Sequence, residues 1–234
     1  TIALFFFVSF FKKDMFSFFA FDVENPLTLD LSSWDTRSVI DMSHMFYELA
    51  KSSTEPATIY ASDKFDLSNA TYASAMFTNC NNLQSITFGT NCTFEKCTSF
   101  GGDSYDFGMF CGCSSLTSLD LSMFDTKSAE NMSHMFKGCT NLKAIKFGTK
   151  FTCGNCTDFR SMFENCNNLK YSTYTSEDDN TPFSVSMFDT KSAVYMQNMF
   201  KLDRSNTAFT SLNLSSWNTA SVIDASGMFN ENRS

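Results

Sequence analysis

Nine cysteines and two histidines supply most of the reactive side-chain chemistry in this 234-residue sequence. Four of the cysteines recur at one position, each of them four residues after a methionine: Cys80, Cys113, Cys139 and Cys166. This regular placement predicts a column of small buried thiols rather than a reactive site. The other five allow one or two disulfides, which would suit a secreted protein, or none: Cys92, Cys97, Cys111, Cys153 and Cys156.

Metal and redox sites find little support in the sequence. Cys153 and Cys156 have C-x-x-C spacing, but a zinc site needs a second ligand pair nearby. A thioredoxin-type site needs a strand-to-helix start in an α/β context, which is absent here. His44 and His134 occupy the same position in distant repeats, so we expect them to be surface side chains that do not meet. No metal or cofactor is expected.

Three aspartates, Asp35, Asp125 and Asp189, also recur at one repeat position. One carboxylate per repeat falls short of the six to eight oxygens that calcium requires. We therefore expect these side chains to hydrogen-bond the turn that follows each of them. Patterns for a nucleophile elbow, a phosphate loop or a dinucleotide fold are missing, so an enzyme is not expected.

The strongest signal is an internal repeat marked by the dipeptide Met-Phe. Seven copies of it recur in phase, 26 to 37 residues apart, with their methionines at Met45, Met76, Met109, Met135, Met162, Met199 and Met228. An eighth pair, at Met15, is in phase with the others. Such periodicity is typical of a solenoid, in which each unit buries its apolar side chains against its neighbours.

Each repeat reads as a strand, a turn, a short helix and a second turn. The Leu-x-x-Leu-x-Leu pattern of residues 116–121 ends in the period-two alternation of a strand. In residues 38–49 apolar positions three and four apart predict the helix. Glycine or asparagine three residues after the methionine predicts its end, at Asn79, Gly112, Gly138 and Asn165. We expect an α/β repeat solenoid, a leucine-rich-repeat-like stack of short strand plus short helix units.

The chain divides into two parts. Residues 1–26 are predicted to be a degenerate first repeat or, alternatively, a leader remnant, because the apolar run at 4–11 precedes its basic pair instead of following it. Residues 27–234 form the solenoid of about seven units. Insertions at 51–58, 101–107, 171–184 and 201–208 are expected to form loops at one edge of the stack.

Charge and hydropathy exclude two classes of partner. The formal net charge is −8, and the 17 lysines and arginines are scattered along the chain, which disfavours nucleic acid. No run of 18 apolar residues occurs, so direct membrane insertion is not expected.

The string from Leu116 to Leu142 resembles the BspA-like leucine-rich repeats of bacterial, mycoplasma and protist surface proteins, and Leu29 to Phe46 and Leu212 to Phe229 follow the same pattern. The resemblance covers roughly residues 27–234. It implies a surface-displayed extracellular protein, often concerned with adhesion, and supplies no catalytic residues.

The expected function is therefore a non-catalytic binding or adhesion module with a protein or glycan partner. The candidate binding surface is a ribbon of outward strand positions: Asp30, Thr87, Asp120, Lys146 and Asn213. A merely solvated face is an equal alternative for these residues. A structural role is the alternative function, in which solenoid ends stack into a surface filament or coat.

Overall fold

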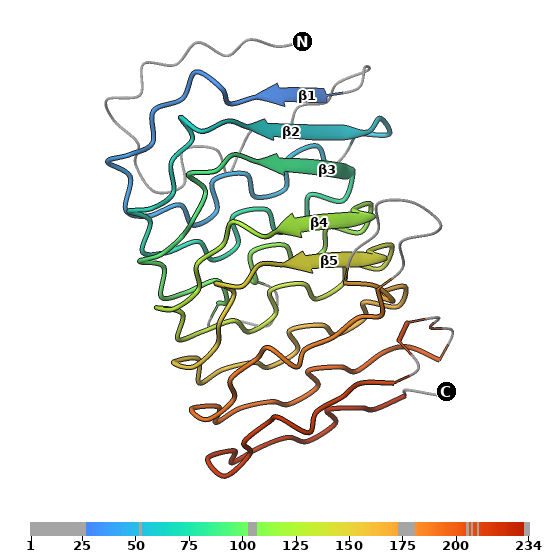
Figure 1. Cartoon of the computed structure of the whole chain (residues 1–234). Helices are drawn as coiled ribbons and strands as arrows, with labels where there is room; N and C mark the ends of the chain where they lie inside the picture. Colours follow the sequence, from blue (N-terminus) through green and yellow to red (C-terminus); the bar gives the residue numbers. More distant parts are fainter. Residues whose placement is uncertain are drawn as a thin grey trace.

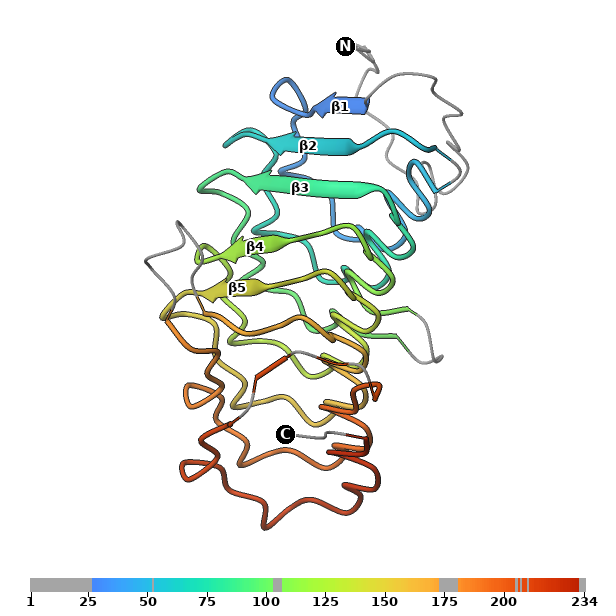
Figure 2. The ribbon, with the colours of Figure 1, turned by 90° about the vertical axis from the view of Figure 1, so that its right-hand side faces the viewer.

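The computed structural model describes residues 27–51, 53–102, 107–172, 181–204, 206, 208–209 and 211–231. The chain winds through successive coils stacked along one axis (Figure 1). One strand lies in each of five coils, and the strands follow one another in chain order along one side of the stack (Figure 2): β1 Leu27–Asp30, β2 Ala57–Ala61, β3 Leu83–Phe88, β4 Ser118–Leu121 and β5 Ala144–Phe147. The predicted segment 1–26 lies outside the described residues.

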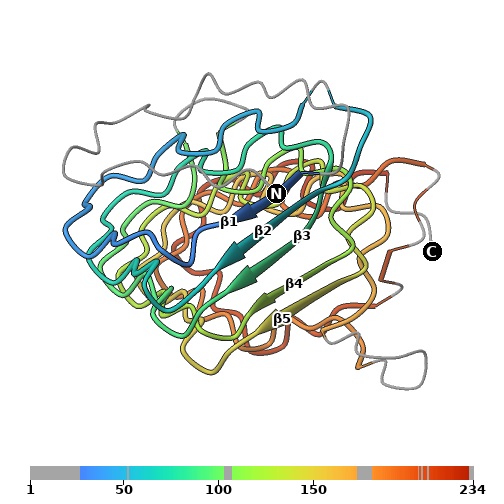
Figure 3. The ribbon, with the colours of Figure 1, turned by 90° about the horizontal axis from the view of Figure 1, so that it is seen from above.

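All strand pairs are parallel, so the fold is a parallel β-solenoid. The strands form a three-stranded sheet, β1-β2-β3, and a two-stranded sheet, β4-β5. Seen along the axis, they line one face, each displaced from the one before (Figure 3). In β1, Leu27 and Leu29 are buried while Thr28 and Asp30 are exposed, as period-two alternation requires. The predicted repeat solenoid is confirmed.

A second line of parallel pairing runs along the stack. Single residues pair from coil to coil in the order Asp41, Tyr72, Ser99, Asn131, Asp158, Tyr195 and Asp224. We call this row the second ladder. This row joins the coils in addition to the strand pairing within the two sheets.

The predicted short helix is wrong, because the described residues contain no helix. In residues 38–49 the amide of Phe46 donates to the Met76 carbonyl of the next coil at 2.8 Å, whereas that of Leu49 donates to Phe46 at 3.0 Å. Alternate amides therefore bond the neighbouring coil, and those between them close tight turns of the i to i−3 kind. An α-helix would direct every amide to the carbonyl four residues back. Consecutive turns also bring positions three and four apart to one side, which explains why the helical spacing misled.

The residues predicted to end the helix do adopt the left-handed conformation. The φ angles are 60° at Asn79 and Asn165 and 74° at Gly112 and Gly138, so they close turns instead of helices. Glu48 has a φ of 59° without being glycine or asparagine. The sequence signal for a left-handed residue was therefore sound, and only its structural context was misjudged.

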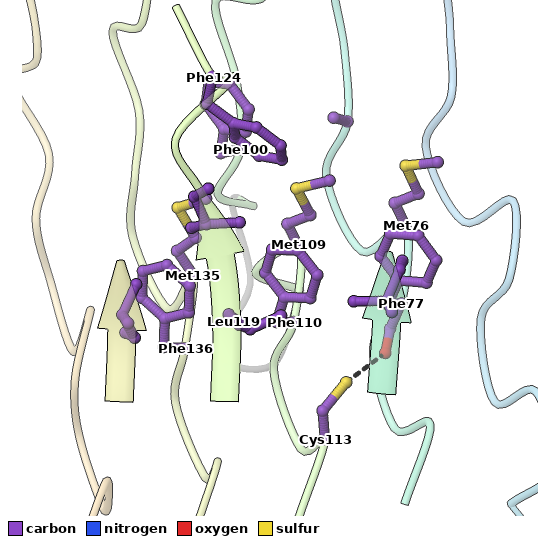
Figure 4. Close-up of a cluster of buried hydrophobic side chains, with 14 of the residues drawn as sticks. Met76, Phe77, Phe100, Met109, Phe110, Cys113, Leu119, Phe124, Met135 and Phe136 are labelled. Carbon is purple, nitrogen blue, oxygen red and sulfur yellow. Dashed lines mark hydrogen bonds between the residues drawn. The ribbon is translucent and has the colours of Figure 1, made fainter. Parts of the chain in front are cut away.

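The seven phenylalanines of the Met-Phe pairs form a continuous column through the core. Successive rings stack with centroids 5.3–5.8 Å apart and planes within 13° of parallel: Phe46, Phe77, Phe110, Phe136, Phe163, Phe200 and Phe229. Figure 4 shows Phe77, Phe110 and Phe136 with the methionines that precede them. Each stacked pair contributes about 0.5–1.5 kcal/mol beyond the apolar area it buries. The column is therefore a main source of cohesion between coils.

Candidate functional site

The four recurrent cysteines form the predicted column of buried thiols. The Sγ–H groups of Cys80, Cys113, Cys139 and Cys166 each donate to a phenylalanine-column carbonyl of the preceding coil, at 3.0–3.1 Å. All nine cysteines of the chain are buried, and none of them forms a disulfide. Burial raises the pKa of Cys113 and Cys139 well above its usual range. These thiols fill space and satisfy carbonyls, and they are not poised as nucleophiles.

The C-x-x-C pair is equally inert. The Cys153 thiol contacts Met132 Sδ at 3.9 Å, and Cys156 donates to the Asp158 carbonyl at 3.4 Å. Burial raises the pKa of Cys156 to about 12. Within the described ranges no group of three or more histidine, cysteine or acidic side chains could hold a metal ion.

The two histidines serve as turn residues, each with a φ of 60°. His134 is only 4% exposed, so its predicted surface position is wrong; His44 is half-buried. Burial lowers the pKa of His134, and the nearby positive charge of Lys137 acts in the same direction. The residues sit in coils that are three steps apart on the second ladder, which gives about 14 Å between those coils.

The recurrent aspartates hydrogen-bond the following turn, as predicted. Oδ1 of Asp35, Asp125 and Asp189 accepts from the amide two residues later at 3.2–3.3 Å. The pKa of Asp35 is lowered to about 2 because Arg37 donates to the carboxylate through its side chain and its amide. Their recurrence therefore reflects turn formation.

The predicted ribbon is exposed at all five positions, Asp30, Thr87, Asp120, Lys146 and Asn213. The structure divides it into smaller groups. Asp30 and Thr87 lie in one row, each paired in register with the residue between them on β2, and Asp120 pairs with Lys146. The Lys146 ammonium lies 2.8 Å from the Asp120 carboxylate. Asn213 lies outside the named strands.

Part of the ribbon has a structural role. Asp30, Asp120 and Asn213 each accept a hydrogen bond from the amide two residues later, at 2.8–3.0 Å. Burial acts to raise the pKa of Asp120, but hydrogen bonds from Lys146 and Ser122 outweigh it and lower that pKa. These oxygens stabilise turns in addition to facing solvent.

Sequence reasoning missed the residue at the centre of the row, Tyr60. It pairs with Asp30 on one side and Thr87 on the other, and its side chain is 50% exposed. Residues 51–58 were assigned to an insertion, although β2 begins at Ala57. The alternation in Ala57–Ala61 was the signal that could have identified this strand.

A groove lies over the second ladder, on a different part of the coil from the ribbon. It encloses about 740 Å³ and is lined by residues that include Asp41, Tyr72, Ser99, Phe107, Glu130 and Asn131. Sequence reasoning missed this site too, because its members come from four coils and only their pairing brings them together. We call it the second-ladder groove.

The fold and these surfaces define a parallel β-solenoid repeat protein with polar exposed faces. Residues 12–88, 94–176 and 175–234 match the family described as "Mycoplasma protein of unknown function, DUF285", and the chain belongs to that family. No curated protein and no solved structure matches the chain. The described residues include no helix long and apolar enough to cross a membrane.

Proposed function

We propose that the chain is a non-catalytic, surface-displayed extracellular binding or adhesion module of the BspA-like kind, with a protein or glycan partner. The resemblance of Leu116–Leu142 to BspA-like leucine-rich repeats supports this assignment, and so does membership of a repeat family. The ribbon of outward strand residues is the candidate contact surface.

The exposed position of Tyr60 on the ribbon is the observation that carries the proposal. An exposed tyrosine on a regular strand offers a rigid, amphipathic contact area at a low entropic cost. Asp30 and Thr87 flank it in register, so one aromatic ring lies between hydrogen-bonding groups on adjacent strands. Interface hot spots have this character, with an aromatic anchor surrounded by polar groups.

The chemistry of the remaining side chains agrees with a binding role. The nine thiols are buried in the coil interior, and burial raises the pKa of Cys92 and Cys97 to about 12. A protonated, buried thiol reacts slowly with oxidants. Cysteines that form no disulfide are therefore compatible with the proposed extracellular location.

An array of glycans and matrix proteins, probed with the purified chain, tests the proposal. Three proteins are compared: the unaltered chain, Tyr60→Ala, and the double variant Asp120→Ala/Lys146→Ala. We expect Tyr60→Ala to abolish binding to at least one arrayed partner and the double variant to weaken it. Tyr195→Ala is the matched control, because Tyr195 is also an exposed tyrosine, at 40%, but lies on the second ladder.

Silence of the unaltered chain across the array would contradict the binding role. Binding that survives both ribbon substitutions would move the contact surface away from the strands. Circular dichroism of each variant separates lost binding from lost fold.

Head-to-tail stacking into a filament or coat is the second candidate. It would extend from copy to copy the parallel ring stacking that joins successive coils within the chain. Light scattering over a range of concentrations tests it. A particle mass that grows with concentration, and that Phe229→Ser keeps constant, supports stacking; a constant monomer mass excludes it.

A further inference from the structure

The second-ladder groove combines an exposed aromatic ring with a row of polar groups. Tyr72 is 47% exposed, whereas the phenylalanines of the core column up to Phe200 are buried. Its neighbours in the row are Asp41 on one side and Ser99 on the other, followed by Asn131. A ring face beside carboxylate, hydroxyl and amide groups is the arrangement that recognises a sugar, whose C–H faces are apolar and whose hydroxyls donate and accept hydrogen bonds.

The groove is preorganised by hydrogen bonds beneath its surface. Ser74 Oγ lies 3.0 Å from Ser99 Oγ, and both hydroxyls donate to the Gly101 carbonyl. The oxygens Asp41 Oδ1 and Asn131 Oδ1 each accept the amide two residues later at 2.9 Å. A carboxylate offers about four acceptor sites, so fixing Asp41 in this way leaves further capacity for a ligand.

The length of the groove and the charge of its lining side chains limit which class of ligand it can bind. From Asp41 to Asn131 the row makes three steps between coils, or about 14 Å, which suits a short oligosaccharide better than a single ring. Asp41 and Glu130 place two carboxylates at the groove, and no lysine or arginine is among its described lining residues. Phosphate, sulfate and other anionic ligands are therefore disfavoured.

Phe107 is the second aromatic residue of the groove. Its ring packs edge-on against His44, with centroids 5.4 Å apart, and His44 lies in the same coil as Asp41. Because the ring is held by this contact, it forms a fixed apolar wall instead of a side chain that must be ordered on binding.

We infer that the second-ladder groove binds a neutral oligosaccharide, with Tyr72 stacking on a sugar face and Asp41, Glu130 and Asn131 binding its hydroxyls. This inference rests on the proposed binding function and adds to it a ligand class and a place separate from the strand ribbon. It requires no catalysis, because the ligand is bound unchanged.

Titration with a panel of neutral oligosaccharides built from hexoses and N-acetylhexosamines, followed by calorimetry, tests the inference on the full chain. We expect Tyr72→Ala to weaken the best binder at least about tenfold, because stacking is lost. Glu130→Gln should weaken it less, since the amide still offers an acceptor. Tyr195→Ala is the matched control and should leave the affinity unchanged.

Salt distinguishes the sugar from a cationic peptide, the other ligand that two carboxylates could attract. Affinity for a neutral sugar should hold between about 0.05 and about 0.5 M sodium chloride, since there is no charge pair to screen. If lysine-rich peptide binds instead of sugar, and salt releases it, the inference is overturned.

The remaining outcomes separate this inference from the proposed function. Sugar binding that is lost in Tyr60→Ala but kept in Tyr72→Ala overturns the groove site and supports the ribbon. Protein binding on the array without any sugar binding also overturns it, while the binding function stands. Tyr72→Phe, which keeps the ring, should retain affinity and shows that loss in Tyr72→Ala is not a folding defect.

Discussion

The Cys113 thiol donates a 3.0 Å hydrogen bond to the carbonyl oxygen of Phe77 in the coil before it (Figure 4). That oxygen also accepts the amide of Cys80 at 3.2 Å, which closes a turn within its own coil. One carbonyl thus joins a tight turn to the next coil, and the relationship is repeated for Cys80, Cys139 and Cys166.

Replacing Cys113 by alanine should reduce the free energy of unfolding by about 1–2 kcal/mol, because a fully buried side chain and its hydrogen bond are removed. Cys113→Ser keeps a donor of similar size and should cost less. Urea denaturation followed by circular dichroism measures both. Equal losses in the two variants would show that the hydrogen bond contributes nothing.

The phenylalanine column predicts that the stability lost on replacing one of its rings depends strongly on the position of that ring in the column. Phe136 is fully buried between two stacked neighbours, so Phe136→Ala should cost about 3–5 kcal/mol of stability. Phe229 has one stacked partner and is 45% exposed, so Phe229→Ala should cost only about 1 kcal/mol. Similar unfolding free energies for the two variants would contradict the view that stacking on both faces holds the coils together.

The buried thiols predict that alkaline pH destabilises the fold. The pKa values of Cys92, Cys97 and Cys156 are raised from 9.0 to about 12 because burial disfavours the thiolate. Between these values the folded chain holds protons that the unfolded chain releases. The contribution of these protonated thiols to the free energy of unfolding is therefore fully present below pH 9. It is lost as pH rises toward 12, by up to about 1.4 kcal/mol per pH unit for each thiol.

The slope of unfolding free energy against pH, between pH 9 and 11, measures this effect. The Cys97→Ala variant should show a slope smaller by about one proton, whatever its stability at neutral pH. An unchanged slope would mean that Cys97 does not retain its proton in the folded state. The native chain should also fail to react with a thiol reagent at pH 8 until it is unfolded.

Close contact between coils predicts that substitution by alanine is tolerated at one glycine and not at another. A Cβ atom at Gly108 would overlap the backbone of His134 and Met135 in the adjacent coil. At Gly154 it would approach only the ends of the Asp189 and Lys191 side chains, at 3.0 and 3.3 Å, and these can move. We expect Gly108→Ala to lower stability by about 3 kcal/mol and Gly154→Ala by less than about 1 kcal/mol. Thermal denaturation of the two variants measures which of them is the less stable.

Much of the fold could be predicted because the repeat depends on sequence patterns that are local to each unit. Met-Phe spacing, the alternation in Leu27–Asp30 and the left-handed residues Asn79 and Gly112 each follow from side-chain and backbone preferences that act within one coil. The column of thiols was predictable for the same reason, since Cys113 and Cys139 hold equivalent positions in their repeats.

The turns that replace the predicted helix could not be predicted in this way, and neither could the candidate sites. Consecutive tight turns and a helix place apolar residues such as Met42, Met45 and Phe46 on one side with the same spacing. Which of them forms depends on whether alternate amides can reach carbonyls in the next coil, as Phe46 reaches Met76. That choice belongs to the stack and not to the single repeat.

The sequence by itself determined that the chain is a repeat solenoid with a strand in each unit, which residues alternate inward, and that the recurrent cysteines are buried. The parallel pairing of those strands came from the structure. Only the tertiary structure decided that turns replace helices, that Tyr60 stands between Asp30 and Thr87, and that Asp41, Tyr72 and Asn131 line one groove. The physical reason is that the deciding contacts join residues about one coil apart, where register between coils, and not local preference, determines what meets.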